Sequence, residues 1–211
     1  MAPAFLTEGP ADAATTVCLA HGAGAPMDSA AMNAISAALA AEGLRVVRFE
    51  FAYMAARREG ARKPPPRGER LVPEYRAAVD ALDGAGRLLI GGKSLGGRVA
   101  SMLADELHRA GRIAGLVCLG YPFHPPAKPQ QLRTAHLADL ATPTLIFQGT
   151  RDPFGTREEV ATYALSRAIE VVFMEDGDHD LKPRKRVTGL SAADHLATIA
   201  RRVAAFADEV A

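Results

Sequence analysis

Residues 87–102, RLLIGGKSLGGRVASM, decide the fold that we expect for this chain. The segment reads as a short apolar strand at 88–90, then two glycines, a serine and an amphipathic helix. Gly92, Ser94 and Gly96 fit the pattern G-x-S-x-G, a sharp strand-to-helix turn that exposes a nucleophilic serine. The glycines are required because larger side chains beside the strained serine would collide with neighbouring backbone. A helix that begins at the serine turns its free N–H groups toward any oxyanion formed there.

Two other interpretations of this stretch have to be weighed. The pattern G-x-S-x-G is short, so a glycine-rich turn that holds a serine by chance is the simplest alternative. The end of a phosphate-binding loop, G-x-x-x-x-G-K-[ST], also resembles these residues. That loop requires a glycine where the sequence has Arg87, and it follows its strand, whereas here the strand occupies 88–90. The sequence therefore excludes a nucleotide-binding P-loop.

Size and composition indicate an ordinary globular protein. The 211 residues are most simply one domain, 1–211, and are long enough to bury a substantial core. A net charge of +1 gives no general attraction to nucleic acid or to a membrane surface. No apolar run approaches the roughly 20 residues that cross a bilayer, and the first residues lack the pattern of a secretory signal. We therefore expect a cytoplasmic protein, and the sequence leaves its oligomeric state open.

Strand-like and helix-like segments alternate along the chain. The strand-like runs lie at 15–20, 44–51, 88–90, 113–121, 144–150 and 168–174, and the helical patterns lie at 28–41, 72–82, 95–107, 157–166 and 191–209. Residues 1–14 are an edge piece or a loose lead-in, and 52–71 and 122–141 are long loops. This alternation predicts a mostly parallel sheet with helices on both faces, and it places ligands at the carboxyl ends of the strands.

Three residues at this edge predict nucleophilic catalysis. A serine hydroxyl needs a base to take its proton, and the base needs an acid to hold its tautomer. After Ser94, Asp152 follows one strand and His179 follows the last strand, in the order serine, acid, histidine. The simpler alternatives are that Asp152 starts a turn before a proline and that His179 is a solvated loop residue. His124 is the rival histidine, but it would reverse the chain order.

Small residues after the first strand predict an oxyanion hole. Such a site needs two backbone N–H groups, one of them from the residue after the nucleophile. Leu95 would supply the first and Ala23 the second, while His21 is expected to be a structural hydrogen-bonding residue. We expect four further residues next to these loops to line the pocket: Gly24, Lys93, Tyr121 and His124.

Two basic stretches, 57–70 and 182–186, follow strand ends. They would favour an anionic acyl substrate or an acidic partner if they flank the pocket. The alternative is a solvated rim, which a nearly neutral chain favours. Of the two interpretations, we prefer the solvated rim.

Cys18 and Cys118 lie in apolar strand-like runs, where a free cysteine usually packs in the core. In the expected strand order their strands flank the strand that leads to Ser94. Two strand spacings separate the cysteines by roughly 10 Å, beyond the ~7 Å limit between the Cα atoms of a disulfide. We therefore predict two free thiols.

With these features placed, the chain resembles the α/β-hydrolase superfamily, and more narrowly a group of small bacterial hydrolases related to dienelactone hydrolase. The same group is similar to the hydrolase-like domain of a subunit of the human non-specific lethal acetyltransferase complex and to a testis-expressed protein. The segments that carry the resemblance span most of the chain: HGAGAPMDS (21–29), GGKSLGGR (91–98), GYPFHPPAKP (120–129), LRTAHL (132–137), QGTRDPFG (148–155) and DGDHDLK (176–182).

The resemblance implies an α/β-hydrolase fold with a minimal lid or none, although 52–71 and 122–141 could cover the site. The nucleophile position holds Ser94 rather than the cysteine of dienelactone hydrolase, so the lactone substrate of that enzyme does not carry over. The expected reaction is hydrolysis of a small ester or thioester through an acyl-serine, with no metal and no organic cofactor. The alternative is a partner-binding module that keeps the fold with little or no turnover.

Overall fold

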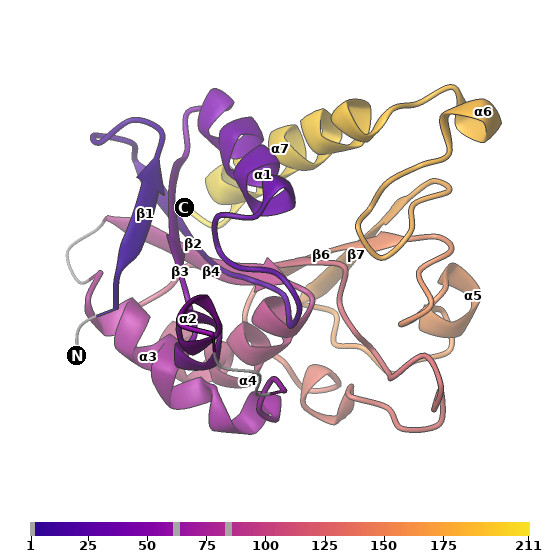
Figure 1. The fold of residues 1–211 in the computed structure, drawn as a ribbon, viewed down its shortest axis with the longest axis horizontal. Helices are drawn as coiled ribbons and strands as arrows, with labels where there is room; N and C mark the ends of the chain where they lie inside the picture. Colours follow the sequence, from indigo (N-terminus) through magenta and orange to yellow (C-terminus); the bar gives the residue numbers. More distant parts are fainter. Residues whose placement is uncertain (1–2, 61–63, 83–85) are drawn as a thin grey trace.

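The structure is a computed structural model, and it describes residues 3–60, 64–82 and 86–211. Within these residues one twisted sheet has the strand order β1-β3-β2-β4-β5-β6-β7 (Figure 1). Only β1 runs antiparallel to its neighbour, β3, and the other neighbouring strands are parallel. The strands are β1 Phe5–Glu8, β2 Thr15–Ala20, β3 Arg45–Phe49, β4 Arg87–Lys93, β5 Gly115–Leu119, β6 Thr144–Gly149 and β7 Ile169–Met174.

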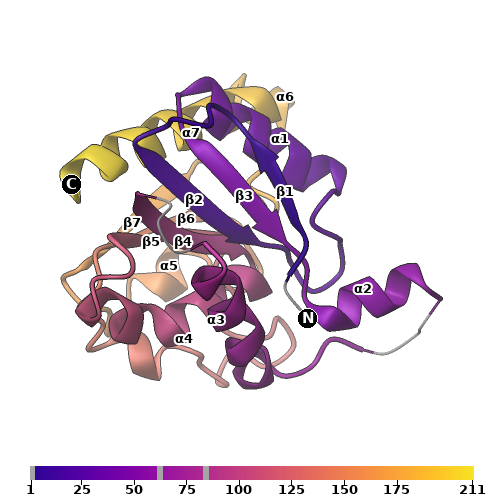
Figure 2. The same cartoon turned by 90° about the vertical axis from the view of Figure 1, so that its left-hand side faces the viewer.

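Helices cover both faces of this sheet. The α-helices are α1 Ala30–Ala41, α2 Ala52–Arg58, α3 Val72–Asp80, α4 Leu95–Arg109, α5 Arg157–Val160, α6 Lys185–Thr188 and α7 Ala192–Glu209, and the 3-10 helices are η1 Gly68–Arg70 and η2 Ala135–Leu137. Figures 1 and 2 show α1 and α7 side by side on one face and α3 and α4 on the other. The predicted α/β layering is confirmed.

Alternation along β2 explains why both faces need a cover. Val17 and Leu19 belong to the core beneath α1 and α7, whereas Cys18 and Ala20 belong to the core beneath α3 and α4. Successive side chains of a strand point to opposite faces, so a strand that is apolar at every position is buried on both sides. Each of the two layers of helices therefore has its own hydrophobic core.

The two cysteines lie where the strand order places them. Cys18 pairs in register with Ile90, and Cys118 pairs with Gly92, so β4 separates them. Both thiols are free and buried. Burial raises the pKa of Cys18 to about 12 and that of Cys118 further still. The prediction of two free thiols is confirmed.

Several boundaries differ from those predicted. The loop predicted at 52–71 contains α2 and η1, whereas residues 1–14 contain the edge strand β1, as one of the two alternatives predicted. The seven residues of α2 show little periodicity, and the helix is held by burial of Tyr53 and Met54 in the core. The helix predicted at 157–166 ends at Val160, and part of the basic stretch 182–186 forms α6. Arg62 and Lys63 of the other basic stretch lie outside the described residues.

Among the described residues, no helix is both long enough and apolar enough to traverse a bilayer. Within the described residues, no inserted subdomain forms a lid over the carboxyl edge of the sheet.

Candidate active site

Ser94 lies at the turn between β4 and α4. Its backbone angles, φ 51° and ψ −112°, are strained for a residue with a side chain. Two hydrogen bonds hold the turn: the Ser94 N–H donates to the Leu119 carbonyl at 3.0 Å, and the Arg98 N–H donates to the Ser94 carbonyl at 3.0 Å. The hydroxyl of this half-buried residue thereby lies at the carboxyl edge of the sheet.

The glycines on either side permit a close approach between β2 and the start of α4. A Cβ atom on Gly92 would lie 2.4 Å from the Ala20 carbonyl oxygen, and one on Gly96 would lie 2.3 Å from the same oxygen. Both distances are well below any real Cβ contact. The sequence pattern therefore has the mechanical basis that was predicted for it.

A continuous chain of hydrogen bonds links the three residues predicted as a triad. Ser94 Oγ lies 2.9 Å from His179 Nε2, and His179 Nδ1 lies 2.8 Å from Asp152 Oδ2. An ionised Asp152 accepts from Nδ1–H, which leaves Nε2 free to accept from the serine hydroxyl. The structure thus brings together side chains that are separated by up to 85 positions in the sequence.

Asp152 is fully buried at the end of β6 and is held by fixed donors. The Phe154 N–H donates to Oδ1 at 2.8 Å, and Gln148 Nε2 donates to Oδ2 at 3.0 Å. Gln148 also accepts from the Tyr121 N–H at 2.8 Å. Sequence reasoning missed Gln148, although a polar residue within the apolar strand 144–149 was a signal that could have found it.

His179 is fixed by two contacts besides the triad. The Lys93 ammonium donates to the His179 carbonyl at 2.7 Å and pairs with Asp180 at 3.3 Å. Phe154 packs on the imidazole with its ring centroid 4.2 Å away. Burial lowers the pKa of Lys93, and the charge of Asp180 opposes that shift. Lys93, the second residue of the G-x-S-x-G turn, thus ties the histidine loop to the serine.

The loop after β2 lies against the same site. Gly22, Ala23 and Gly24 line a cavity of about 310 Å³ together with Ser94 and His179. Ala23 and Leu95 line a second cavity of about 610 Å³, which also opens at Ser94. The two residues predicted to donate to an oxyanion therefore flank the hydroxyl, as does the predicted lining residue Gly24.

His21 has the structural role expected of it. Its Nε2 accepts from the Phe51 N–H at 3.2 Å, and its Nδ1 lies 2.7 Å from the Gly22 carbonyl. Burial lowers the pKa of His21, which favours the neutral ring that these two bonds require. His21 thus shapes the loop that carries Ala23.

Comparison with known proteins places this geometry in a family. Residues 13–208 match the family described as "Alpha/beta hydrolase domain". The chain belongs to the alpha/beta hydrolase family. The narrower resemblance to the non-specific lethal complex subunit and to a testis-expressed protein stays a prediction.

Solved structures with the same fold include several hydrolases. Dienelactone hydrolase from Anabaena variabilis is 20% identical with a TM-score of 0.71, and covers 97% of this chain and 90% of its own. The esterase domain of a Rhodothermus marinus protein is 20% identical with a TM-score of 0.67, covering 97% and 92%. An alpha-beta serine hydrolase homologue from Coxiella burnetii is 19% identical with a TM-score of 0.68, covering 99% and 91%. At these identities the likeness shows the fold alone.

Two of the residues predicted to line the pocket lie elsewhere. Tyr121 is fully buried, and its hydroxyl donates to the Arg133 carbonyl at 3.1 Å. His124 is also buried, with Nε2 3.4 Å from Glu159 Oε2. The expectation that they line the pocket was wrong, because the chain turns at Gly120 (φ 66°), after which Tyr121 packs into the α3/α4 core and His124 lies against Glu159. Lys93, the remaining candidate, does line the cavity beside His179.

The two basic stretches contribute unequally to the site. Arg58 is paired with Asp28 and Glu50, and Arg184 with Asp176, so these charges are neutralised on the surface. Arg67 lines the 610 Å³ cavity next to Ser94. Among the described residues, no group of three or more His, Cys, Asp or Glu is arranged to hold a metal ion.

Proposed function

We propose that this chain is a serine hydrolase that cleaves a carboxylic ester or thioester through an acyl-serine. Ser94 is the nucleophile, His179 the general base and acid, and Asp152 the residue that orients the imidazole. The observation that carries the proposal is the unbroken relay, 2.9 Å from Ser94 Oγ to His179 Nε2 and 2.8 Å from His179 Nδ1 to Asp152 Oδ2.

Acylation begins with attack of Ser94 Oγ on the carbonyl carbon, while the hydroxyl proton passes to His179 Nε2. The carbonyl oxygen becomes an oxyanion that accepts from the backbone N–H groups of Leu95 and Ala23. When this intermediate collapses, the C–O or C–S bond breaks, and His179 Nε2 gives its proton to the departing oxygen or sulfur. The acyl group remains on Ser94.

Deacylation repeats the sequence with water. His179 Nε2 takes a proton from the water as its oxygen attacks the acyl carbon. The bond between the acyl carbon and Ser94 Oγ then breaks, His179 Nε2 returns a proton to Oγ, and the carboxylic acid leaves. The buried carboxylate of Asp152 stabilises the imidazolium that forms in both halves. Loss of one oxyanion donor in such sites lowers kcat by roughly 100-fold to 1000-fold.

A fluorophosphonate probe tests the proposal, since it labels serines that are activated in this way. We expect wild-type protein to be labelled and Ser94→Ala to be inert. Ser101→Ala is a matched control, because Ser101 Oγ also lies 2.8 Å from a histidine, His136 Nε2, but is buried away from the relay. Its labelling should equal that of wild type.

Well-folded wild-type protein that takes up no probe would refute the proposal and favour the partner-binding module. Where labelling succeeds, a panel of 4-nitrophenyl esters and acyl thioesters of graded chain length separates esterase from thioesterase activity by kcat/KM.

A further inference from the structure

Ser94 lies at the boundary of two cavities with different linings. The first, which we call the arginine cavity, has a volume of about 610 Å³ and is lined in part by Arg67, Leu95, Arg98 and Arg133. The second, the small-residue cavity, has a volume of about 310 Å³ and is lined in part by Gly22, Gly24, Met32 and His179. Ser94, Ala23 and Phe154 border both.

The position of His179 distinguishes the roles of the two cavities. In the proposed reaction, His179 Nε2 must reach the leaving-group atom in order to protonate it. Of the two cavities, His179 lines the small-residue cavity. The leaving alcohol or thiol therefore belongs on that side, and the acyl chain extends into the arginine cavity, past Leu95.

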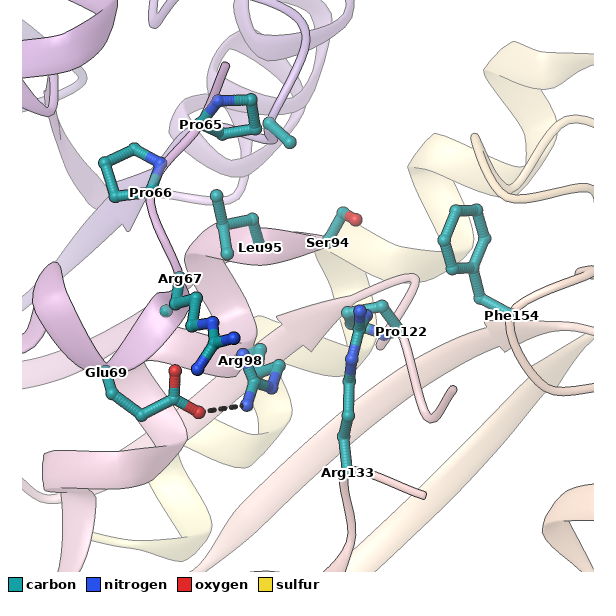
Figure 3. A pocket seen from close by; sticks show the side chains of 12 residues that line it. Pro65, Pro66, Arg67, Glu69, Ser94, Leu95, Arg98, Pro122, Arg133 and Phe154 are labelled. Carbon is teal, nitrogen blue, oxygen red and sulfur yellow. Dashed lines mark hydrogen bonds and ion pairs between the residues drawn. The ribbon is translucent and has the colours of Figure 1, made fainter. Parts of the chain in front are cut away.

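The arginine cavity has an excess of positive charge. Three arginines line it together with one acid, Glu69, which accepts from Arg98 Nη2 at 2.7 Å (Figure 3). Within the part of the chain that the structure describes, no ion pair or side-chain hydrogen bond engages the guanidinium of Arg67 or Arg133. Glu69 acts on Arg67 and Arg133 through its charge alone, so one carboxylate faces three guanidinium groups and the cavity keeps an excess of positive charge.

Burial makes this charge costly. The Arg98 side chain is only 14% exposed, and its Nε is buried without a hydrogen-bond partner. Arg133 is half-buried, and its pKa is lowered first by burial and then by the positive charge of Arg98. An anion that enters the cavity would relieve this repulsion and supply the missing acceptor.

The small-residue cavity differs in this respect. Its cation, Lys93, is already paired with Asp180 at 3.3 Å and bonded to the His179 carbonyl. An anionic leaving group would meet the carboxylate of Asp180 there. The lining of the arginine cavity therefore favours an anionic group, whereas the lining of the small-residue cavity does not.

We propose that the arginine cavity binds a carboxylate on the acyl part of the substrate, so that the preferred substrate is a monoester or monothioester of a dicarboxylic acid. This inference rests on the proposed function and names its substrate class. The bond from Arg98 to Glu69 shows that a guanidinium in this cavity is oriented to donate to a carboxylate oxygen. The volume of the cavity, 610 Å³, falls within the roughly 300–1000 Å³ of small-molecule sites.

Two matched pairs of esters test whether a substrate carboxylate is favoured on the acyl side or on the leaving-group side of the scissile bond. The first pair is 4-nitrophenyl hydrogen adipate and methyl 4-nitrophenyl adipate, which differ by an acyl-side carboxylate. The second is 4-carboxyphenyl butanoate and its methyl ester, which differ by a leaving-group carboxylate. With uncatalysed rates subtracted, we expect the acyl-side carboxylate to raise kcat/KM about tenfold to a hundredfold, the range for one charged hydrogen bond, and the leaving-group carboxylate to give no gain.

Arg133→Gln should lower the acyl-side preference at least tenfold. Its own backbone bonds, from the Arg133 N–H to Phe123 and from the Tyr121 hydroxyl to Arg133, do not involve the side chain that is changed. Arg201→Gln is the matched control, because it removes the same charge from an exposed position on α7. Its preference should equal that of wild type.

Ligand binding to the Ser94→Ala variant, which cannot turn over, tests the carboxylate site independently of the proposed hydrolase activity. By calorimetry, monomethyl adipate should bind at least tenfold more tightly than dimethyl adipate. Equal binding, or equal hydrolysis of the first pair by a labelled wild-type enzyme, overturns the substrate class and leaves the hydrolase standing. If wild type is neither labelled nor active, the proposed function fails, and the binding result still decides whether the cavity takes a carboxylate.

Discussion

The close approach of β2 to the start of α4 is the feature that positions the serine, and Gly96→Ala tests it. A Cβ atom on Gly96 would lie 2.3 Å from the Ala20 carbonyl oxygen, 2.6 Å from its carbon and 2.9 Å from the Ala20 side chain. Two of these three atoms are backbone, so no change of rotamer can relieve the overlap. The strand and the helix must therefore move apart.

The size of that movement follows from the distances. Real Cβ atoms essentially never approach closer than 3.0 Å, so the two elements separate by about 0.7 Å. Overpacking of this kind costs about 1–3 kcal/mol. At roughly 2–4 °C per kcal/mol in a domain of this size, Tm should fall by about 2–12 °C. Displacement of the serine by a similar distance should lower kcat/KM about tenfold to a hundredfold, since misplacing a reacting group by about 1 Å lowers the rate about a hundredfold.

Thermal unfolding and the rate of fluorophosphonate labelling measure these two effects. Gly22→Ala is the matched control for stability, because its new Cβ would meet no atom closer than 3.7 Å. Its Tm should stay within about 2 °C of wild type. A Gly96→Ala protein with the wild-type Tm and labelling rate would refute the view that this contact positions Ser94.

Four further substitutions test other parts of the site. Asp152→Asn should lower kcat about 1000-fold to 10,000-fold with Tm nearly unchanged, as expected for loss of the correct imidazole tautomer; a loss below tenfold would contradict the relay. Lys93→Met should lower kcat/KM about tenfold, because the histidine loop loses one charged hydrogen bond, and unchanged kinetics would argue against that tie. Ser94→Gly should abolish labelling while raising Tm by about 2–4 °C, since glycine removes roughly 1 kcal/mol or more of backbone strain. Arg184 holds the pKa of Asp176 at about 2, so this pair stabilises the fold above about pH 4, and the stabilisation is lost as the pH falls toward 2. Asp176→Asn should therefore flatten the dependence of Tm on pH between about pH 4 and pH 2. Parallel curves for the variant and wild type would contradict this role of the pair.

Much of the relay could be predicted because it depends on topology. Parallel strands end at one edge of the sheet, so polar residues that directly follow strands are brought together whatever their separation in sequence. Ser94, Asp152 and His179 each follow a strand within a few residues. Local pattern was therefore enough to predict their convergence.

Features that depend on long-range packing could not be predicted in this way. Arg133 and Arg98 face the same cavity from a loop and a helix with no shared motif. The helix α2 forms because Tyr53 and Met54 are buried by distant elements, and its short sequence has too few turns for periodicity to show. Tyr121 was misplaced because nothing in the sequence marks the turn at Gly120 as one that directs the following side chain inward.

The contacts around the relay bear on which function this fold serves. A strained serine costs of order 1–3 kcal/mol and persists only where the surroundings hold it. Here three independent devices hold the members of the relay: the glycines beside Ser94, the two donors to Asp152, and the ammonium that fixes the backbone of His179. A module that only binds a partner would gain stability by relaxing the strained turn and would need none of the three. Their joint presence at one edge of the sheet therefore favours turnover over scaffolding.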